Sequence, residues 1–545
     1  MRRLSLRRWL AVLSLGFVAL TAPFLGRYPL ISGDDALILA VGHKWAASGV
    51  FGSDLFAGFH GADRHYFMNF PLHHVWQTAV FTRFGSGFAQ ARAVALAFAV
   101  LLLWPVGWLA DRWYGRAAGL LAPLLLVAWR SGLTGPGIPL LLVGRTARYD
   151  AGAVFWSWLA VALLLVLLRR RSAWLALAVG LCGGFAALTQ FFGLFSLPLI
   201  AWLWLRGETR AGRRPWRDPL TYALAAGGLL PLLPYAWYAA QHWADAIAQL
   251  SVHGGRADFG SPAFFWHNLR AEPRRYAGLL RPPGTDADGY HALSGWLLLL
   301  GAPAVLWHTV RRWRRERGQG DAVLLASLVV FGGGLALLEG TKAPLYAVIL
   351  LPAVCILFAR AGVEWLRGGR RQTAVGLLLA AVVLAEGGLT YAVNLRRAVQ
   401  ATPYAVAGQQ LRAALPRDLP PETAVVAFER WWWALQPEHP VLIWYNLWEQ
   451  WRVAQARPAP PTLPELVSDT PAGVLVVSPV DWSAVQRYPP RLQAEFGHLL
   501  RACAAEIGRV ADPAYGELTL YRLNRAPDGG LRCAGRNPWF VIRDP

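Results

Sequence analysis

The chain has 545 residues, of which 55% are hydrophobic and 16% charged, with a mean hydropathy of +0.34 and a formal net charge of +21. Because a soluble protein of this size carries about 25% charged residues, this composition excludes an ordinary soluble protein. A large positive charge suggests nucleic-acid binding in a soluble chain. Here the arginines lie mostly in short loops between apolar runs, so we expect a polytopic membrane protein without a nucleic-acid partner.

Apolar runs recur along the first 400 residues and, at about 17–22 residues each, are long enough to cross a bilayer as helices. We predict a mainly α fold, a polytopic helical membrane bundle followed by a C-terminal soluble α/β domain. The third run is short, and the "GIPLLLVG" after it is typical of a half-buried or re-entrant piece. About eleven spans are predicted, over residues 9–30, 90–110, 117–132, 151–168, 173–188, 191–205, 219–239, 292–310, 322–338, 343–361 and 373–393.

The distribution of arginines predicts how these spans are oriented across the membrane. With the N-terminus in the cytoplasm, the inside segments hold 22 arginines in 48 residues, whereas the outside loops hold 11 lysines or arginines in 133 residues. Because basic loops stay on the cytoplasmic side, we expect a multi-pass protein of the cell inner (cytoplasmic) membrane whose C-terminal domain is periplasmic or extracellular. The opening "MRRLSLRRW" resembles a signal-peptide n-region, but no clear small-x-small cleavage site follows, so we expect an uncleaved anchor.

Two domains are expected. Residues 1–395 form the transmembrane module, and residues 31–89 within it form a long outside loop. In this loop "HYFMNFPLHHVWQTAVFTRFG" has an apolar face at helical spacing, typical of a helix lying on the membrane surface. Residues 396–545 form the outside-facing α/β domain, because short strand-like runs alternate there with polar helical stretches. The strand-like runs are "TAVVAF", "VLIWY", "GVLVVS" and "LTLYRL".

Two features of the C-terminal domain stay open at the level of sequence. Cys503 and Cys533 form a disulfide only if the domain faces an oxidising compartment. The aromatic "ERWWWALQ" is either a membrane-interface belt or a carbohydrate-stacking surface, and we favour the belt.

Unusual polar residues gather at the outside ends of the predicted spans. Ionisable groups at membrane depth are costly and usually face a cavity or a partner, so we expect a common pocket. Its basic groups match phosphate oxygens, and its acidic groups can take a proton from a nucleophile. The candidates are Asp34, Asp35, Arg145, Arg148, Asp150, Lys342 and Tyr346.

Each of these groups can also be explained by a structural role that needs no substrate pocket. The pair Asp34 and Asp35 is typical of a solvated loop after a first span. The stretch "RTARYD" fits a cluster with an internal ion pair, and Lys342 fits an anchor at the membrane interface. The sequence alone does not choose between these interpretations and the pocket.

Four motifs, in order and all on the predicted outside, resemble those of the GT-C-type membrane glycosyltransferases, in particular the group of protein O-mannosyltransferases and lipid A aminoarabinose transferases. In "GDDALILAVGHKWAASGVF", Asp34 takes the first acidic place and Asp35 replaces the usual Glu. In "RTARYDAGAVFW", Arg148 and Asp150 match the second acidic motif. The stretch "MNFPLHHVWQTAVFTRFGSGFAQAR" matches through Pro71, Leu72, Trp76, Phe84, Gly85 and Arg92, and "TKAPLYAVILLPAV" matches through Lys342, Tyr346 and Pro352.

The resemblance covers roughly residues 1–400 and implies an enzyme that transfers a sugar from a polyprenyl-phosphate-linked donor, with inversion, at the outer face of the cytoplasmic membrane. It implies Asp34 as the base on the acceptor hydroxyl. Arg148 and Lys342, with Arg145 in reserve, would stabilise the departing phosphate, and Asp150 would orient the acceptor, the donor sugar or Arg148. Asp35 and Tyr346 would contact substrate. No cofactor is required, although a divalent metal is not excluded, and the partners are the lipid-linked donor, membrane lipids and a glycan, lipid or protein acceptor.

Two other functions stay open. A transporter or flippase of a lipid-linked glycan often shows internal repeats and broken helices at the bilayer midplane; this sequence shows no internal repeat, and its charged sites lie at one face. A non-catalytic envelope-assembly protein would depend wholly on its outer domain for binding a partner.

Overall fold

The computed structural model describes residues 5–130, 137–252, 259–280, 293–455, 457–486, 488–527 and 529–534. Its contacts divide the chain into a helical unit, Met1–Leu25 with Phe67–Ala398, and an α/β unit, Gly26–Tyr66 with Val399–Pro545. The sequence assigned all of 31–89 to a module ending at residue 395. In the structure residues 26–66 group with the C-terminal residues instead, because α2 (Gly33–Ser48) packs on α20 (Glu429–Leu435) and η1 (Asp54–Phe56) contacts β2 (Val441–Ile443).

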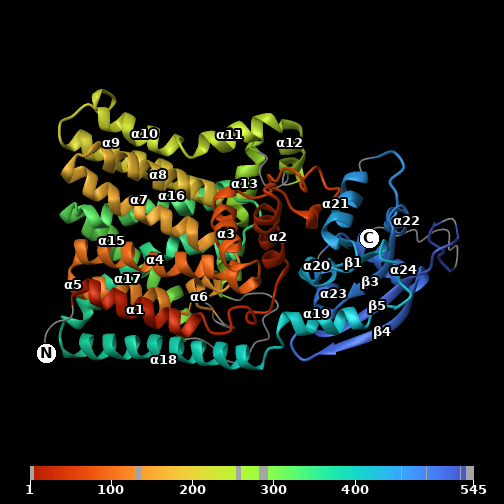
Figure 1. The fold of residues 1–545 in the computed structure, drawn as a ribbon. Helices are drawn as coiled ribbons and strands as arrows, with labels where there is room; N and C mark the ends of the chain where they lie inside the picture. The colour runs from red at the N-terminus through yellow and green to blue at the C-terminus, as the bar shows by residue number, and fades with distance from the viewer. Residues whose placement is uncertain are drawn as a thin grey trace. The chain divides into compact units, whose positions relative to one another are not determined.

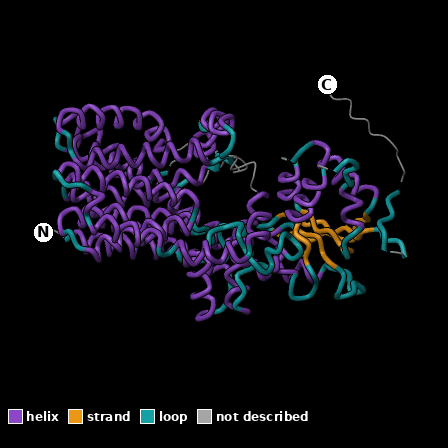
Figure 2. The backbone as a smooth tube through the Cα atoms, turned by 90° about the horizontal axis from the view of Figure 1, so that it is seen from above, coloured by secondary structure: helices purple, strands orange, loops and turns teal. Residues whose placement is uncertain are grey.

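The long helices of the helical unit run roughly parallel to one another (Figure 1; Figure 2, purple). Its first half comprises α1 (Leu6–Thr21), α3 (Pro71–Phe84), α4 (Phe88–Tyr114), α5 (Arg116–Ala128), α6 (Pro139–Gly144), α7 (Asp150–Arg170), α8 (Ala173–Thr189), η2 (Phe191–Phe195) and α9 (Ser196–Arg210). Its second half comprises η3 (Pro215–Arg217), α10 (Pro219–Leu229), α11 (Leu232–Gln241), α12 (Trp243–Val252), α13 (Pro262–Ala271), α14 (Pro273–Leu280), α15 (Leu293–Glu316), α16 (Gln319–Leu338), η5 (Pro344–Leu350), α17 (Leu351–Leu366) and α18 (Arg370–Gln400).

Each of the eleven predicted apolar runs is largely helical. Among the described helices, six are long and apolar enough to cross a membrane, or seven if the pair α10 and α11, bent by 45°, counts as one span. Helices α5 and α8 are apolar but shorter. The protein is therefore a multi-pass membrane protein, and the count of eleven spans stays a prediction.

Prolines shorten one predicted span and break another. Helix α1 ends at Thr21 rather than at residue 30, because Pro23 and Pro29 lack the amide hydrogen that a continuing helix needs. The seventh span breaks between α10 and α11 at Pro231 for the same reason.

Glycine allows a close contact between two helices of the helical unit. Helices α8 and α10 cross where Gly180 and Gly227 face backbone atoms. A Cβ at Gly180 would lie 2.1 Å from the carbonyl oxygen of Leu224, and one at Gly227 would lie 2.2 Å from that of Leu177. Small residues that let backbones approach are typical of helix packing in membranes, so any side chain here would push the two helices apart.

The α/β unit is built on a five-stranded sheet of order β2-β1-β3-β5-β4, in which β1 runs parallel to β2 and β3, and β5 runs antiparallel to β3 and β4 (Figure 2, orange). The four predicted strand-like runs are confirmed as β1, β2, β3 and β5. The elements not yet bounded are α19 (Tyr404–Ala413), β1 (Ala424–Ala427), α21 (Trp444–Ala454), α22 (Leu463–Ser468), β3 (Ala472–Val477), α23 (Pro479–Val485), α24 (Pro490–Ala502), β4 (Ala504–Asp512) and β5 (Gly516–Leu523).

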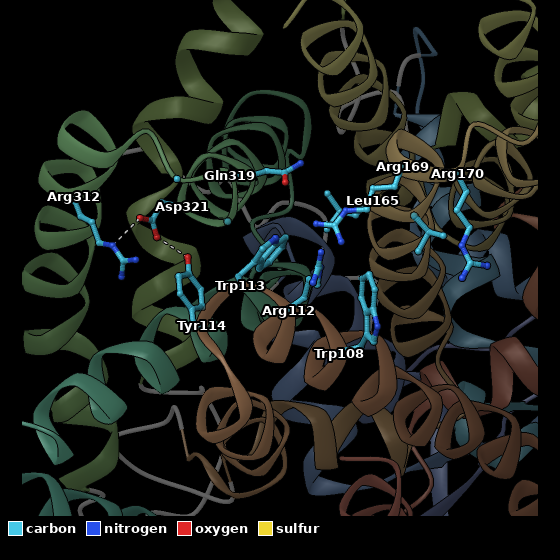
Figure 3. Close-up of a pocket in the computed structure, with 13 residues that line it drawn as sticks. Trp108, Arg112, Trp113, Tyr114, Leu165, Arg169, Arg170, Arg312, Gln319 and Asp321 are labelled. Atoms are coloured by element: carbon cyan, nitrogen blue, oxygen red, sulfur yellow. Dashed lines mark hydrogen bonds and ion pairs between the residues drawn. The ribbon is translucent and has the colours of Figure 1, made fainter. Parts of the chain in front are cut away.

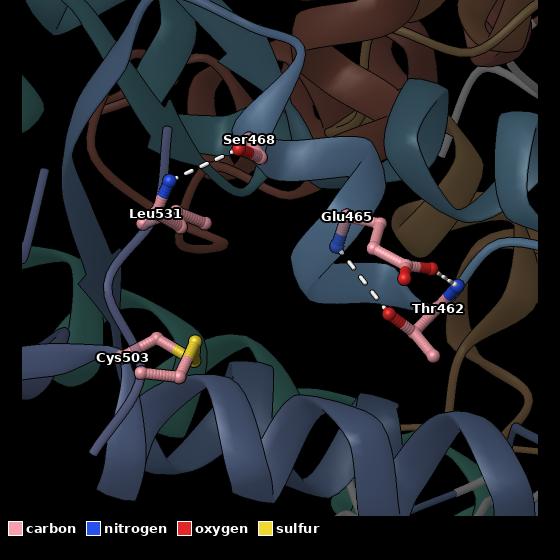
Figure 4. Close-up of a disulfide and its surroundings, with 6 residues drawn as sticks. Thr462, Glu465, Ser468, Cys503 and Leu531 are labelled. Atoms are coloured by element: carbon pink, nitrogen blue, oxygen red, sulfur yellow. Dashed lines mark hydrogen bonds between the residues drawn. A yellow bond between two sulfur atoms is a disulfide. The ribbon is translucent and has the colours of Figure 1, made fainter. Parts of the chain in front are cut away.

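The C-terminal segment is fixed to this unit covalently. Cys503, at the end of α24, forms a disulfide with Cys533 (Figure 4). Nearby, the Leu531 amide donates to the Ser468 hydroxyl at 3.0 Å. The pairing that the sequence left open is therefore present in the structure, and a disulfide is typical of an oxidising compartment.

The membrane-belt interpretation of "ERWWWALQ" is wrong for two of its three tryptophans. Trp431 and Trp432 are 0% and 4% exposed, and Trp431 stacks on Tyr404 with ring centroids 5.9 Å apart. These indoles belong to the core of the α/β unit, where α20 packs against β1, β2 and α19.

Candidate active-site groups

The first residue of α7, Asp150, is fully buried and accepts a hydrogen bond from Nε of Arg148 at 2.7 Å. The start of a helix favours a carboxylate, because its exposed amide groups carry partial positive charge. The second carboxylate oxygen, Oδ1, is also buried and meets no hydrogen-bond donor among the described residues. The ion pair expected within "RTARYD" is present, yet it leaves one strong acceptor unused.

Aromatic rings surround the Arg148 guanidinium. Its central carbon lies 5.7 Å from the ring centroid of Tyr149 and 6.0 Å from that of Tyr346 in η5. On α3, Nε2 of buried His73 lies 3.2 Å from the Ala147 carbonyl oxygen. Burial, followed by the neighbouring His74, lowers the pKa of His73 to about 3, so its ring is neutral. The structure thus brings Arg148, Asp150 and Tyr346 together.

Lys342 lies in a different cluster, between α16 and η5. Its Nζ donates to the carbonyl oxygens of Leu335 at 3.1 Å and Ala336 at 2.8 Å, and it lies 3.1 Å from a carboxylate oxygen of Glu272. These three acceptors match the three hydrogens of an ammonium group. The Lys342 backbone has φ 54°, a conformation that costs a non-glycine residue about 1–2 kcal/mol, so the cluster holds it firmly.

Arg275 closes the cluster around Lys342. This fully buried side chain donates from Nε to Glu272 at 2.8 Å, from Nη2 to Glu339 at 2.7 Å and from Nη1 to the Ala343 carbonyl at 2.7 Å. Two cations therefore face two carboxylates. Burial lowers the pKa of Lys342, and Glu272 opposes this shift.

Arg145 has a third environment. Its Nη2 donates to the Pro23 carbonyl at 3.2 Å, just beyond the end of α1. Arg92 likewise donates to the Leu25 carbonyl at 2.9 Å. Both arginines are buried, and both hold the chain that leaves α1.

In the α/β unit the two adjacent aspartates differ. Asp35 is buried and completes a capping box at the start of α2: its carboxylate accepts from the Ser32 amide at 3.1 Å and hydroxyl at 2.8 Å, and its amide donates to the Ser32 hydroxyl at 3.2 Å. Asp34, one residue earlier, is exposed. The capping box therefore fixes the backbone that carries Asp34.

A further carboxylate, Glu429, lies beside Asp34 and was not predicted from the sequence. It is the first residue of α20, directly after parallel strand β1, and a Cβ at Gly33 would lie 3.3 Å from its Oε2. Burial, then Asp481 and Asp34, raises the pKa of Glu429 to about 7, against the opposing effects of its own backbone amide and of Arg430. The available signal is its position, since ligands often bind at the carboxyl ends of parallel strands.

One group of potential metal ligands occurs among the described residues, His498 with Cys503 and Cys533. The two cysteines are joined to each other, so their sulfur atoms are not thiolates. This group does not match a metal site.

No protein-family model matches this sequence, and no curated protein matches it. Solved structures do match. The Cupriavidus metallidurans ArnT structure bound to undecaprenyl phosphate is 16% identical, covers 94% of this chain and 98% of its own, and gives a TM-score of 0.56.

The apo oligosaccharyltransferase of Archaeoglobus fulgidus is 13% identical, covers 95% of this chain and 74% of its own, and gives a TM-score of 0.59. The AglB structure from the same organism, in complex with an inhibitory peptide and a dolichol-phosphate, is 14% identical, covers 98% and 75%, and gives a TM-score of 0.56. The resemblance predicted from the four motifs is thus confirmed at the level of architecture: this chain has the fold of the GT-C-type membrane glycosyltransferases.

Proposed function

We propose that this protein transfers a sugar from a polyprenyl-phosphate-linked donor to a glycan, lipid or protein acceptor at the outer face of the cytoplasmic membrane. The observation that carries the proposal is the Arg148–Asp150 pair at the start of α7, in a chain whose fold matches ArnT over almost the full length of both proteins. Since one fold serves many functions, the pair carries the chemical part of the argument.

The donor side of the reaction requires charge stabilisation. In an inverting displacement the bond between the anomeric carbon and the lipid phosphate breaks while a bond to the acceptor oxygen forms. The phosphate leaves with added negative charge, and Arg148, held by Asp150, is the group that we assign to it. The unused Oδ1 of Asp150 is suited to accept a hydrogen bond from a sugar hydroxyl, and Tyr346 lines the same cluster.

Lys342 can bind the donor phosphate only if it gives up one of its present hydrogen-bond acceptors. Its three hydrogens already have acceptors, so a phosphate oxygen would have to replace Glu272. Such a replacement preserves the local charge balance, because Arg275 continues to hold Glu272. Arg145 is a reserve cation at most, since it holds the Pro23 carbonyl.

The acceptor side requires a base. We assign Asp34 to take the hydroxyl proton, because it is exposed on a fixed helix start whereas Asp35 is engaged in the capping box. Glu429 beside it, with a pKa near neutrality, is suited to pass that proton on to solvent. No metal is required in this scheme, because cationic side chains neutralise the leaving phosphate.

The arginine distribution and the disulfide support the proposed location. The arginine-rich loops favour the cytoplasm. The Cys503–Cys533 bond supports an α/β unit in the periplasm or outside the cell.

The test is a transfer assay with the full-length protein in nanodiscs, supplied with radiolabelled polyprenyl-phosphate sugars and cell-envelope acceptors. We expect Asp34→Asn to abolish product formation while expression and the elution profile stay unchanged. Asp63→Asn, a carboxylate change in the same segment, is the matched control and should retain activity. Full activity of Asp34→Asn would remove this residue from the mechanism, and transport of a lipid-linked glycan without a covalent product would overturn the enzyme proposal.

A further inference from the structure

A polar cavity lies at the end of the helical unit that is opposite to Asp150. Its volume is about 500 Å³, and it is lined by the last residues of α4 and α7, by Arg312 of α15 and by the first residues of α16 (Figure 3). Asp150 begins α7, whereas Arg169 and Arg170 end it 19 and 20 residues later. At 1.5 Å per residue the cavity is about 30 Å from Asp150, so it is separate from the candidate active-site groups.

One wall of this cavity is electrically balanced. Asp321 accepts from Nη1 of Arg360 at 2.8 Å and from the Tyr114 hydroxyl at 2.5 Å, and Arg312 lies 3.5 Å away. Arg312 also pairs with Glu364 at 2.9 Å. Two cations, Arg312 and Arg360, thus lie against two carboxylates, Asp321 and Glu364, so this wall carries no excess charge.

The opposite wall carries unbalanced positive charge. Within the described ranges, no carboxylate lies within ion-pair distance of Arg112, Arg169 or Arg170. Arg112 and Arg169, from α4 and α7, point toward one another beside Trp113 (Figure 3). Two guanidinium groups that converge repel each other unless an anion lies between them, and arginine is the residue best matched to phosphate.

The approach to this wall is apolar. Leu101, Trp104, Trp108 and Arg112 follow one another at intervals of three or four residues on α4, so they share one helix face. Leu101 and Trp104 are 45% and 38% exposed, as expected for side chains that face acyl chains. This face therefore leads from hydrocarbon, past the Trp108 indole, to an arginine.

A smaller cavity adjoins the first. It has a volume of about 280 Å³, shares Arg169 and Gln319 with its neighbour, and adds Arg206, Arg210 and Arg213. Its carboxylate, Glu208, pairs with Arg171 at 2.6 Å and with Arg213 at 3.7 Å, and no ion pair to Arg206 or Arg210 occurs among the described residues. The excess of arginine thus extends over a region large enough for a second phosphate.

We propose that these adjoining cavities bind the headgroup of an anionic phospholipid, with its acyl chains along α4, and that a headgroup with two phosphates binds best. Basic pockets between membrane helices on the cytoplasmic side are suited to such headgroups, and the arginine-rich loops place this end there. The apolar face of α4 favours a lipid over a soluble phosphate. The site is independent of the sugar-transfer proposal.

The test titrates delipidated full-length protein in detergent with cardiolipin, phosphatidylglycerol or phosphatidylcholine and counts bound lipid by native mass spectrometry. We expect affinity to fall in that order. The double variant Arg112→Gln/Arg169→Gln should weaken cardiolipin binding about tenfold to thirtyfold, given about 1 kcal/mol per arginine near a lipid surface. The control Arg370→Gln/Arg371→Gln removes the same charge outside both cavities and should change binding less than threefold.

A second double variant tests the smaller cavity alone, because its two arginines do not line the larger cavity. Arg206→Gln/Arg210→Gln should remove the advantage of cardiolipin over phosphatidylglycerol and leave the latter unchanged. If the control variant loses as much cardiolipin affinity, the binding depends on the overall positive charge and not on these cavities. Displacement of cardiolipin by millimolar inorganic phosphate would identify a soluble anion instead, and preferential binding of undecaprenyl phosphate would identify a donor-lipid site; each result overturns the proposal.

Discussion

The start of α7 and the turn after α16 both bury ionic side chains in the helical unit, but they balance them differently. Around Lys342 two cations face two carboxylates, and each ammonium hydrogen has an acceptor. At Asp150 one oxygen is bonded to Arg148, and the other meets no donor among the described residues. Leaving a buried polar atom without a partner costs about 1–3 kcal/mol. Ion pairing therefore accounts for the cluster at Lys342, whereas the second oxygen of Asp150 leaves an acceptor open to a ligand.

The largest expected effect tests the closed cluster. Arg275→Met would leave Glu272 with Lys342 alone and remove the cation that faces Glu339. Breaking a buried pair by removing one partner costs about 3–5 kcal/mol, so we expect a clear fall in the thermal unfolding temperature of the full chain, followed by circular dichroism.

The neighbouring Arg274→Met is the matched control, because Arg274 is exposed. It should leave the unfolding temperature nearly unchanged. Equal stability of both variants would mean that the cluster around Lys342 is not closed, and the contrast with Asp150 would disappear.

The next effect tests the open oxygen. Asp150→Asn keeps an acceptor for Arg148 but removes the charge that holds the guanidinium and replaces one acceptor with a donor. We expect sugar transfer to fall about a hundredfold, equivalent to about 2.7 kcal/mol, at nearly unchanged unfolding temperature. Asp111→Asn, at the other end of the helical unit, should retain activity. A large loss of stability at full activity would mark Asp150 as purely structural.

Glu429 extends the comparison to the α/β unit, as a partly buried acid whose raised pKa Arg430 opposes only in part. Its pKa of about 7 in the folded protein exceeds the ordinary 4.5, so the folded state binds the proton more tightly than the unfolded state. The resulting stability is complete below pH 4.5 and is lost as the pH rises through 7. We estimate the change at about 2 kcal/mol, since the side chain is only partly withdrawn from solvent.

Glu429→Gln should therefore flatten the decline in stability of the α/β unit between about pH 5 and pH 8. Pulse proteolysis of the full chain across this range measures the effect. Exposed Glu422→Gln is the control and should retain the wild-type slope. An unchanged slope in Glu429→Gln would show that the carboxyl titrates normally.

The helices and most strands were predictable because their signals are local. Each apolar run is a property of neighbouring residues, and so are the buried strands β1 and β3. Strand β4 was missed because it lies at the sheet edge and most of its residues are at least partly exposed. Its sequence "AAEIGRVAD" therefore shows no apolar run.

The candidate site was predictable only in part, because partners depend on tertiary structure. Arg148 and Asp150 are two residues apart, so their pairing was foreseeable, whereas Glu272 precedes Lys342 by seventy residues. The role of Glu429 could be inferred only once the sheet topology was known. Asp35 is different: "SGDD" places an acid three residues after Ser32, a local capping signal, and this explains much of the acidic pair.

The smallest expected effect decides whether the closed cluster also serves catalysis. If phosphate replaces Glu272 at Lys342, Lys342→Ala should raise the KM for the donor about tenfold, or about 1.4 kcal/mol, and leave the KM for the acceptor within twofold. Lys342→Arg should restore part of the donor affinity, because it retains the charge. Kinetics with varied donor and fixed acceptor, and the reverse, measure both constants. If neither KM changes while stability falls, Lys342 only closes the turn after α16, and Arg148 remains as the cation assigned to the phosphate.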